Sequence, residues 1–248
     1  MNVVSFEKNL RIAGLQKNST VDFPGLLSAV VFFAGCNFRC YYCHNSAILD
    51  SAADGLPLLR VGEVMDFLDR RRGLLDGVVI SGGEATLQQG LYAFAKNVKA
   101  MGYKVKLDTN GSRPETVASL LDGGLLDFVA VDYKAPFRMY GEVGGGPAAH
   151  EAAGRVLETF GLLRDAGVPY EIRVTMIPEI TEKALAEMAE SLPRLERFAL
   201  QLYRPTGDDG RLRPVGDEEA GRGQPYTPTD LERLAKGIRY AQPNVTVR

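Results

Sequence analysis

Residues 29–45 read AVVFFAGCNFRCYYCHN and join a short apolar segment to three closely spaced cysteines. Residues 29–33 are aromatic, β-branched or alanine, a composition typical of strands that are buried on both faces, as strands of parallel sheets are. The cysteines follow directly, as Cys36, Cys40 and Cys43, in the pattern C-x3-C-x2-C. The sequence therefore predicts a buried strand that ends in a loop of metal-binding side chains.

Strand-like and helix-like segments alternate on the C-terminal side of this loop. The expected strands are residues 29–33, 78–80, 104–108, 128–132, 171–177 and 198–203, and the expected helices lie around 61–68, 86–101, 115–121 and 156–163 and from Thr181 and Thr227 onward. Such alternation predicts a parallel sheet covered by helices. Six strand-plus-helix units are two fewer than a complete barrel contains. We therefore predict an α/β fold, a partial, open (β/α)6 TIM-like barrel with a short N-terminal extension and a C-terminal helix.

The expected organisation is one domain at residues 28–248 preceded by an extension at residues 1–27, which forms a hairpin across residues 11–25. Residues 207–225 are rich in Gly, Arg, Asp and Glu and have neither helical nor strand periodicity. We expect a solvated loop there, with a lid or a partner-docking segment as the alternative.

The composition is that of a globular protein. The 248 residues include 29 Lys and Arg against 31 Asp and Glu, for a net charge of −2, and 45% are hydrophobic. This balance provides no broad basic field for nucleic acid. Charged residues interrupt the N-terminal segment, and no apolar run approaches the roughly 20 residues of a membrane span. We expect a cytoplasmic protein whose partners include neither nucleic acid nor a membrane.

The three cysteines indicate a metal centre, because an odd number of thiols in a reducing compartment does not suit disulfide bonding. Thiolates at this spacing can converge on one centre, and such soft ligands select zinc, copper(I) or an iron–sulfur cluster. Zinc requires a fourth ligand, and His44 is too close in sequence to Cys43 to complete a tetrahedron comfortably. A four-iron cluster would instead keep one iron without a protein ligand. A zinc-binding interaction module without catalysis is the remote alternative.

The cysteine pattern, with an aromatic residue directly before the last cysteine, resembles the signature of radical S-adenosylmethionine (SAM) enzymes. This resemblance implies a [4Fe-4S] cluster held by Cys36, Cys40 and Cys43, with the open iron chelated by SAM. It implies an oxidoreductase in which an electron from the reduced cluster cleaves SAM to methionine and a 5′-deoxyadenosyl radical, which abstracts a hydrogen atom.

Motifs at the ends of the expected strands resemble SAM-binding elements of the same family. Residues 81–84 (SGGE) resemble the GGE element, residues 108–111 the DTNG element, and residues 132–134 (DYK) the D-x-K element of glycyl-radical activating enzymes. Taken alone, the first two are ordinary turns and the lysine is a surface residue. The resemblance implies that SAM is contacted by Tyr42, His44, Gly82, Gly83, Glu84, Asp108, Asn110, Asp132, Lys134 and Met176.

One element departs from the pattern. Pyruvate formate-lyase activases have a Pro-Tyr-His element at the end of the sixth strand, whereas residues 200–205 here read LQLYRP. Tyr203 or Arg204 is the expected substitute for the histidine. Arg173, on the preceding strand, is a further candidate for the site, with packing at the edge of the core as the alternative.

Residues 14–25 (GLQKNSTVDFPG), together with Cys43-His44-Asn45, resemble the activating proteins of anaerobic ribonucleoside-triphosphate reductase. This implies that the substrate is a glycine of that reductase, on which a glycyl radical is installed, and that a flavodoxin- or ferredoxin-type protein donates the electron. The alternatives are an activase of another glycyl radical enzyme and a radical SAM enzyme acting on a small metabolite. Because all three cysteines are used, no auxiliary cluster is expected.

Overall fold

The computed structural model describes residues 10–49, 57–205 and 223–248, which divide into two compact units. The first unit takes in the described parts of Met1–Asn37, Asn45–Ala130 and Gly154–Pro169, and the second those of Phe38–His44, Val131–Ala153 and Tyr170–Arg248. The cysteine loop is thus divided, with Cys36 in the first unit and Cys40 and Cys43 in the second.

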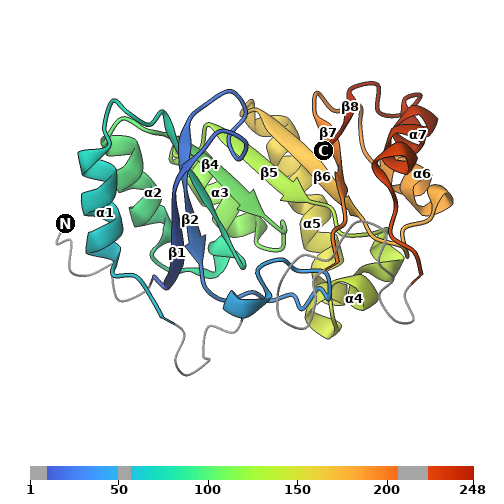
Figure 1. Cartoon of the computed structure of the whole chain (residues 1–248), viewed down its shortest axis with the longest axis horizontal. Coiled ribbons are helices and arrows are strands. Elements are labelled where there is room, and N and C mark those ends of the chain that lie inside the picture. The colour runs from blue at the N-terminus through green and yellow to red at the C-terminus, as the bar shows by residue number, and fades with distance from the viewer. Residues whose placement is uncertain (1–9, 50–56, 206–222) are drawn as a thin grey trace. The chain divides into compact units, whose positions relative to one another are not determined.

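Within the described residues, eight strands are hydrogen-bonded in the order in which they occur along the chain (Figure 1). They are β1 (Ile12–Ser19), β2 (Ser28–Phe33), β3 (Gly77–Gly82), β4 (Lys104–Thr109), β5 (Phe128–Asp132), β6 (Tyr170–Met176), β7 (Phe198–Leu202) and β8 (Val245–Val247). β1 runs antiparallel to β2, whereas the pairs β2–β3, β3–β4, β6–β7 and β7–β8 are parallel. The predicted α/β fold with an open, mostly parallel sheet is confirmed, its six expected strands being β2 to β7. The strand β8 was not expected.

Helices follow most strands. They are α1 (Val61–Arg70), α2 (Leu91–Ala100), α3 (Pro114–Asp122), α4 (Tyr140–Val143), α5 (Pro147–Ala166), α6 (Glu182–Glu190) and α7 (Pro228–Ile238), with short 3-10 helices η3 (Ser46–Ile48), η4 (Ala85–Leu87) and η5 (Phe137–Met139). Thr181 and Thr227 cap α6 and α7 through their hydroxyls, as side chains at helix N-termini commonly do. The helix expected from residue 86 begins later, at Leu91, because Glu84 caps a separate 3-10 turn and the backbone at Gln88 is extended.

The first unit has an apolar core on β2, β3 and β5, to which the segment after β1 contributes. Phe23 is buried with Val30, Val79, Phe128 and Ala130, and its ring lies 6.2 Å from that of Phe128. A Cβ on Gly77 would lie 2.9 Å from the Phe23 ring, so the glycine leaves room for this ring where a side chain would crowd it. The segment 20–26 therefore packs into the unit to which β1 and β2 belong. A domain boundary at residue 27 stays a prediction.

The second unit packs α6 and α7 beside β6, β7 and β8 (Figure 1). Their buried faces carry Leu185, Met188, Leu231, Leu234 and Ile238. Glu171 on β6 is fully buried and accepts two hydrogen bonds from the Arg248 guanidinium, at 3.2 and 2.8 Å. This bidentate pair joins β6 to the residue that follows β8.

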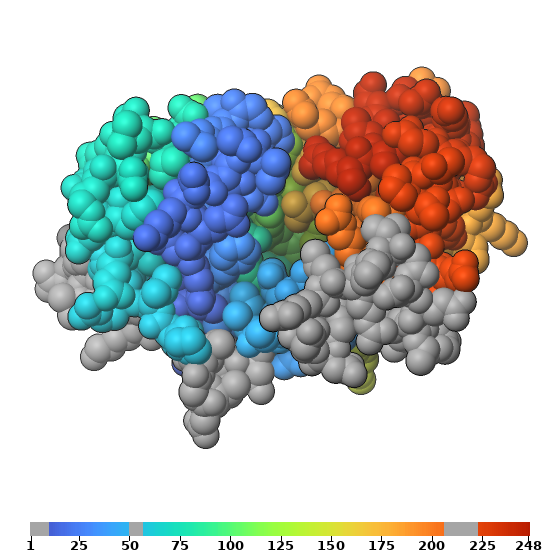
Figure 2. Space-filling model, in the orientation of Figure 1, coloured from blue at the N-terminus to red at the C-terminus, as the bar shows by residue number. Residues whose placement is uncertain are grey.

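β1 and α1 form part of the surface of the first unit in the view of Figure 2. Across the described ranges, no helix combines the length and the apolar character needed to span a bilayer. Residues 206–222, most of the predicted loop 207–225, lie outside the described residues.

Candidate functional site

The cysteine loop starts where the buried strand β2 ends. Gly35 turns the chain with a φ of +91°, a conformation that favours glycine. The Gly35 and Cys36 amides donate to the carbonyls of Ile48 and Leu49, so the turn around η3 braces this end of the loop. None of the three cysteines is in a disulfide bond, and Cys40 is buried whereas Cys36 and Cys43 are half-buried. Within the described ranges, no group of three or more His, Cys, Asp or Glu side chains stands ready to hold a metal ion.

Two predicted site residues, Gly82 and Gly83, lie directly against this loop. A Cβ on Gly82 would meet the Phe33 nitrogen at 2.2 Å, and one on Gly83 would meet the Gly35 oxygen at 2.1 Å. Neither position has space for a side chain. Gly83 and Glu84 donate their amides to the Phe33 and Gly35 carbonyls, both at 2.8 Å. The glycines thus allow the end of β3 to approach the backbone that leads to Cys36.

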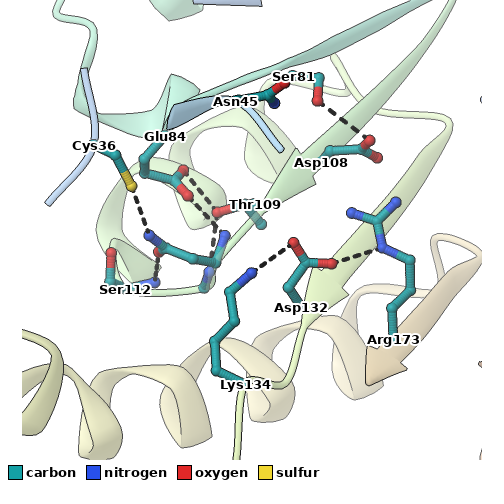
Figure 3. Close-up of polar contacts among 12 residues, drawn as sticks. Cys36, Asn45, Ser81, Glu84, Asp108, Thr109, Ser112, Asp132, Lys134 and Arg173 are labelled. Atoms are coloured by element: carbon teal, nitrogen blue, oxygen red, sulfur yellow. Dashed lines mark hydrogen bonds and ion pairs between the residues drawn. The ribbon is translucent and has the colours of Figure 1, made fainter. Parts of the chain in front are cut away.

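Glu84 faces the loop after β4, within the first unit (Figure 3). Its carboxylate is fully buried and accepts from the Thr86 amide and hydroxyl, from the Thr109 hydroxyl at 2.8 Å and from the Asn110 amide at 2.7 Å. Burial raises the pKa of Glu84, and the surrounding donors oppose that rise. Glu84 therefore links the ends of β3 and β4. A direct contact with SAM stays a prediction.

Asn110 is positioned next to the first cysteine. Its side-chain amide donates to Asn37 Oδ1 at 3.0 Å and points its Nδ2 at Cys36 Sγ from 3.9 Å, while its Oδ1 accepts from the Ser112 amide. An N–H group directed at a thiolate stabilises its negative charge.

Two side chains of helix α5 hold the loop that follows β4. Thr159 donates its hydroxyl to the Gly111 carbonyl at 2.7 Å, and Arg155 donates Nε to the Ser112 carbonyl at 2.8 Å. Sequence reasoning missed both residues, because nothing in the α5 sequence indicates a partner more than 40 residues away. The turn at Asn110-Gly111 is thus fixed by side chains of α5 as well as by its own backbone preference.

Asp108, a predicted SAM contact, is paired with a buried lysine of its own strand. Lys106 Nζ lies 2.9 Å from Asp108 Oδ1, and the Ser81 hydroxyl donates to Oδ2 at 3.4 Å. The Lys106 side chain is 3% exposed and that of Asp108 13%. The lysine was not among the predicted site residues.

In the second unit, Asp132 joins two cations (Figure 3). Its carboxylate lies 3.0 Å from Lys134 Nζ and 2.8 Å from Arg173 Nε. Burial alone would raise the pKa of Asp132, but Arg173 and Lys134 hold it well below its usual range. Burial likewise opposes the charge of Lys134, yet Asp132 raises the pKa of this lysine well above its ordinary value. Two cations around one carboxylate can accept a further anionic group such as a ligand carboxylate.

The second and third cysteines lie in an aromatic environment. Tyr42 is buried, with the Lys134 ammonium 5.9 Å from its ring centroid, and burial raises the pKa of its phenol. Tyr203 is also buried and packs edge-on against Tyr41 and Tyr42, with centroids 6.2 and 6.3 Å apart. Of the two residues proposed to replace the missing histidine, Tyr203 thus faces the cysteine loop with its ring.

The other predicted residues of this unit have backbone or packing contacts. The exposed Arg204 offers its carbonyl to His44 Nε2 at 3.1 Å. Met176, at the end of β6, is fully buried. Tyr41, which was not predicted as a site residue, donates its hydroxyl to Glu179 at 2.6 Å.

A glycine turn after α4 supports the loop between the first two cysteines. The Arg39 amide donates to the Gly144 carbonyl at 2.8 Å, and a Cβ on Gly145 would meet the Arg39 oxygen at 2.4 Å. Gly145 also has a φ of +81°. Sequence reasoning missed this close approach, for which the three consecutive glycines at residues 144–146 are the signal.

These residues fit an iron–sulfur cluster and its ligand. Three cysteine thiols on one loop, none of them in a disulfide bond, form a soft donor set, which iron–sulfur clusters require. The adjacent His44 is engaged with a backbone carbonyl through Nε2. The three sulfurs by themselves are one short of a closed four-coordinate zinc site.

Comparisons with known proteins agree with this chemistry. The family model of the radical SAM superfamily matches residues 30–192. A protein of Methanocaldococcus jannaschii named as a glycyl-radical enzyme activating enzyme is 31% identical over 240 residues, covering 96% of this chain and 95% of that protein. The pyruvate formate-lyase-activating enzyme of Streptococcus mutans is 28% identical over 263 residues, covering 96% of this chain and 94% of the enzyme. The pyruvate formate-lyase 1-activating enzyme of Escherichia coli K12 is 29% identical over 245 residues, covering 92% and 94%.

Solved structures share the fold. SuiB of Streptococcus suis bound to S-adenosylmethionine superposes with a TM-score of 0.62 at 16% identity, and covers 86% of this chain. The protein anSMEcpe with bound AdoMet has a TM-score of 0.60 at 16% identity, and covers 87% of this chain. The match takes in 48% and 61% of those two longer chains.

The chain therefore belongs to the radical SAM superfamily, whose members are enzymes with a [4Fe-4S] cluster. Within that superfamily it is a relative of the glycyl-radical enzyme activating enzymes along nearly its whole length. Family membership replaces the alternative of a zinc-binding module without catalysis.

Proposed function

We propose that this protein installs a glycyl radical on an anaerobic ribonucleoside-triphosphate reductase. The observation that carries the activating function is the half-buried cluster of Asp132, Lys134 and Arg173 beside Tyr42, which provides the charges that a methionine carboxylate needs next to the cysteine loop. The choice of the reductase rests on the resemblance of residues 14–25 and of Cys43-His44-Asn45.

In this proposal Cys36, Cys40 and Cys43 hold the [4Fe-4S] cluster, and the other residues bind SAM. When bound, the cluster and SAM supply the electron and the 5′-deoxyadenosyl radical that takes a hydrogen atom from the glycine. Lys134 and Arg173 receive the methionine carboxylate, and the backbone at Gly82, Gly83 and Glu84 receives the ammonium. Asp108 accepts from the ribose hydroxyls. The remaining contacts come from Tyr42, His44, Asn110 and Met176, with Tyr203 and Arg204 in place of the absent histidine.

The chain's own residues prepare this binding site. Asp132 keeps Lys134 charged and holds both cations in place, since a carboxylate between two cations restrains their side chains. Asn110 directs an N–H at Cys36 Sγ. Glu84 fixes the Asn110 backbone to the end of β3.

The first experiment measures the cluster and SAM cleavage. Protein purified anaerobically should be brown and contain iron, and after reduction it should convert SAM to 5′-deoxyadenosine and methionine. Cys40→Ala should abolish this conversion, whereas Ser46→Ala, an exposed change in η3, should preserve it. A colourless protein that holds one zinc, or undiminished turnover in Cys40→Ala, would overturn the proposal.

The second experiment identifies the partner. A pyruvate formate-lyase activase is the second candidate function, because relatives that bear this name match the chain along more than nine-tenths of its length. The reduced protein is mixed with SAM and either the reductase or the lyase from the same genome, and the doublet resonance of a glycyl radical is recorded. The proposal expects it on the reductase. A doublet on the lyase alone would select the second candidate, and cleavage of SAM with no doublet on either would favour a small metabolite as substrate.

We also propose that the electron comes from a flavodoxin- or ferredoxin-type protein, because the cluster must be reduced at a low potential. Each reduced donor, supplied in place of a chemical reductant, should support formation of 5′-deoxyadenosine. Failure of both donors while a chemical reductant succeeds would contradict this assignment.

A further inference from the structure

Lys106 is a buried cation for which the proposed function has so far no use. It lies in the middle of β4, and its side chain is 3% exposed. Its ammonium lies 2.9 Å from Asp108 Oδ1, donates to the Asp22 carbonyl at 2.5 Å and lies 5.9 Å from the Phe128 ring centroid. All of these groups belong to the first unit.

The surroundings make a lysine here an unexpected choice for stability. Phe128 and Phe23 belong to the apolar core of the unit, and Asp22 directly precedes Phe23. Replacing a buried ion pair by apolar residues of similar volume is often neutral or stabilising, because desolvation of the charges offsets their attraction. A lysine in such a place is therefore weak evidence for a stabilising role, and the charged group that it faces is Asp108.

The geometry gives Asp108 one defined orientation. Lys106 forms an ion pair with the buried Oδ1, and Lys106 is itself restrained by a hydrogen bond to the Asp22 carbonyl, so the ammonium is a fixed anchor. The Ser81 hydroxyl lies at 3.4 Å from Oδ2, a weak contact that adds little restraint. Oδ1 is buried, whereas a carboxylate has about four acceptor sites, so Oδ2 is the oxygen that keeps capacity for hydroxyl donors at the carboxyl end of β4.

We propose that Lys106 is a positioning residue, which orients the Asp108 carboxylate so that it accepts both hydroxyls of a ribose diol. The inference rests on the proposed function, in which that diol belongs to SAM. A site built to hydrogen-bond a hydroxyl discriminates strongly against an analogue that lacks it. Lys106 would therefore determine how strongly the protein selects ribose over deoxyribose.

The experiment measures the dissociation constants of SAM and of its 2′-deoxy and 3′-deoxy analogues with the cluster-loaded protein. The discrimination ratio is the constant of each analogue divided by that of SAM. In the unaltered protein it should be roughly 10- to 100-fold for at least one analogue, as expected for hydrogen bonds to a charged group. Asp108→Ala should reduce the ratio to about 1, because it removes the acceptor.

Lys106→Met should lower the discrimination ratio at least about fivefold. The double variant with Lys106→Met and Asp108→Ala should have the same ratio as Asp108→Ala alone, because the lysine acts through the carboxylate. The matched control is Lys104→Met, on the same strand, where the lysine is 61% exposed and pairs with Asp127. It should preserve the ratio. A purely structural role of Lys106 would change the melting temperature and the iron content but would not change the ratio.

Each outcome separates the inference from the proposed function. If Lys106→Met has the same discrimination ratio as the unaltered protein, the proposed role of Lys106 is wrong. A ratio near 1 in the unaltered protein also overturns that role. Neither result contradicts the proposed function, which is tested by SAM cleavage. Absence of any SAM binding by the cluster-loaded protein overturns the proposed function itself. If Lys106→Met does not fold, Lys106→Gln removes the charge and keeps an N–H donor. Its ratio should fall at least about threefold, and an unchanged ratio overturns the inference.

Discussion

Replacing Glu84 by alanine should destabilise the protein strongly, although Glu84 lies in a motif associated with ligand binding. The substitution removes the acceptor of two buried backbone amides, those of Thr86 and Asn110, and of the Thr86 and Thr109 hydroxyls. A buried donor without an acceptor costs about 1–3 kcal/mol, so the two amides together cost roughly 2–6 kcal/mol. Water entering the space left by the side chain recovers part of this, which brings the expected loss to about 3 kcal/mol.

The loss is measured by thermal and urea unfolding of the cluster-loaded protein under anaerobic conditions. At roughly 2–4 °C per kcal/mol for a chain of this size, the midpoint should fall by about 6–12 °C. Glu84→Gln should lose about 1–3 kcal/mol, because the amide group presents a donor to one of the four donors that face it. Glu158→Ala, an exposed change on α5, is the control and should stay within about 0.5 kcal/mol. A Glu84→Ala protein that melts within about 2 °C of the unaltered one would refute the linking role.

Three further changes test other parts of the structure. Arg173 and Lys134 hold the pKa of Asp132 below its usual value of 3.8, so the stabilising contribution of Asp132 is fully present above pH 3.8 and is lost as the pH falls below that value. The unfolding free energies of Asp132→Asn and of the unaltered protein should therefore converge in acid. A difference that stays constant with pH would contradict this pKa assignment. Gly145→Ala should lower the unfolding free energy by about 2 kcal/mol and should reduce the iron content more than Gly146→Ala does. Both glycines have a positive φ, but only Gly145 lies against the Arg39 oxygen. Equal effects of the two changes would contradict the close approach at Gly145. Arg248→Ala should lower the free energy of urea unfolding by about 3 kcal/mol, because it removes the cation that pairs with the buried Glu171 carboxylate. Adding Glu171→Gln to this variant should recover part of the loss, since it removes the buried charge. No recovery in the double variant would contradict this explanation.

The repeated strands and helices were readable from the sequence because each is encoded locally. Residues 29–33 and 128–132 are short apolar runs, and they form β2 and β5. Thr181 and Thr227 are hydroxyl residues at helix starts, and both cap their helices. The strand β8 was missed because three residues carry too little periodicity to be recognised.

The chemical identity of the centre was also local. Three cysteines at fixed spacing on one loop determine a soft donor set whatever surrounds them. The motif glycines were found in the same way, but their partner was not. Gly82 and Gly83 make room for the cysteine-loop backbone at Phe33 and Gly35, which lie some 50 residues earlier in the chain.

The sequence by itself determined the open α/β fold, the three thiols and the strand ends from which the other candidate residues come. Only the tertiary structure decided what each of three charged side chains does. Glu84 became a link between two loops, Lys106 an anchor for Asp108, and Asp132 the centre of two ion pairs. The reason is physical: the role of a buried charged group is set by the donors and acceptors that surround it, and most of these come from distant segments that only folding brings into contact.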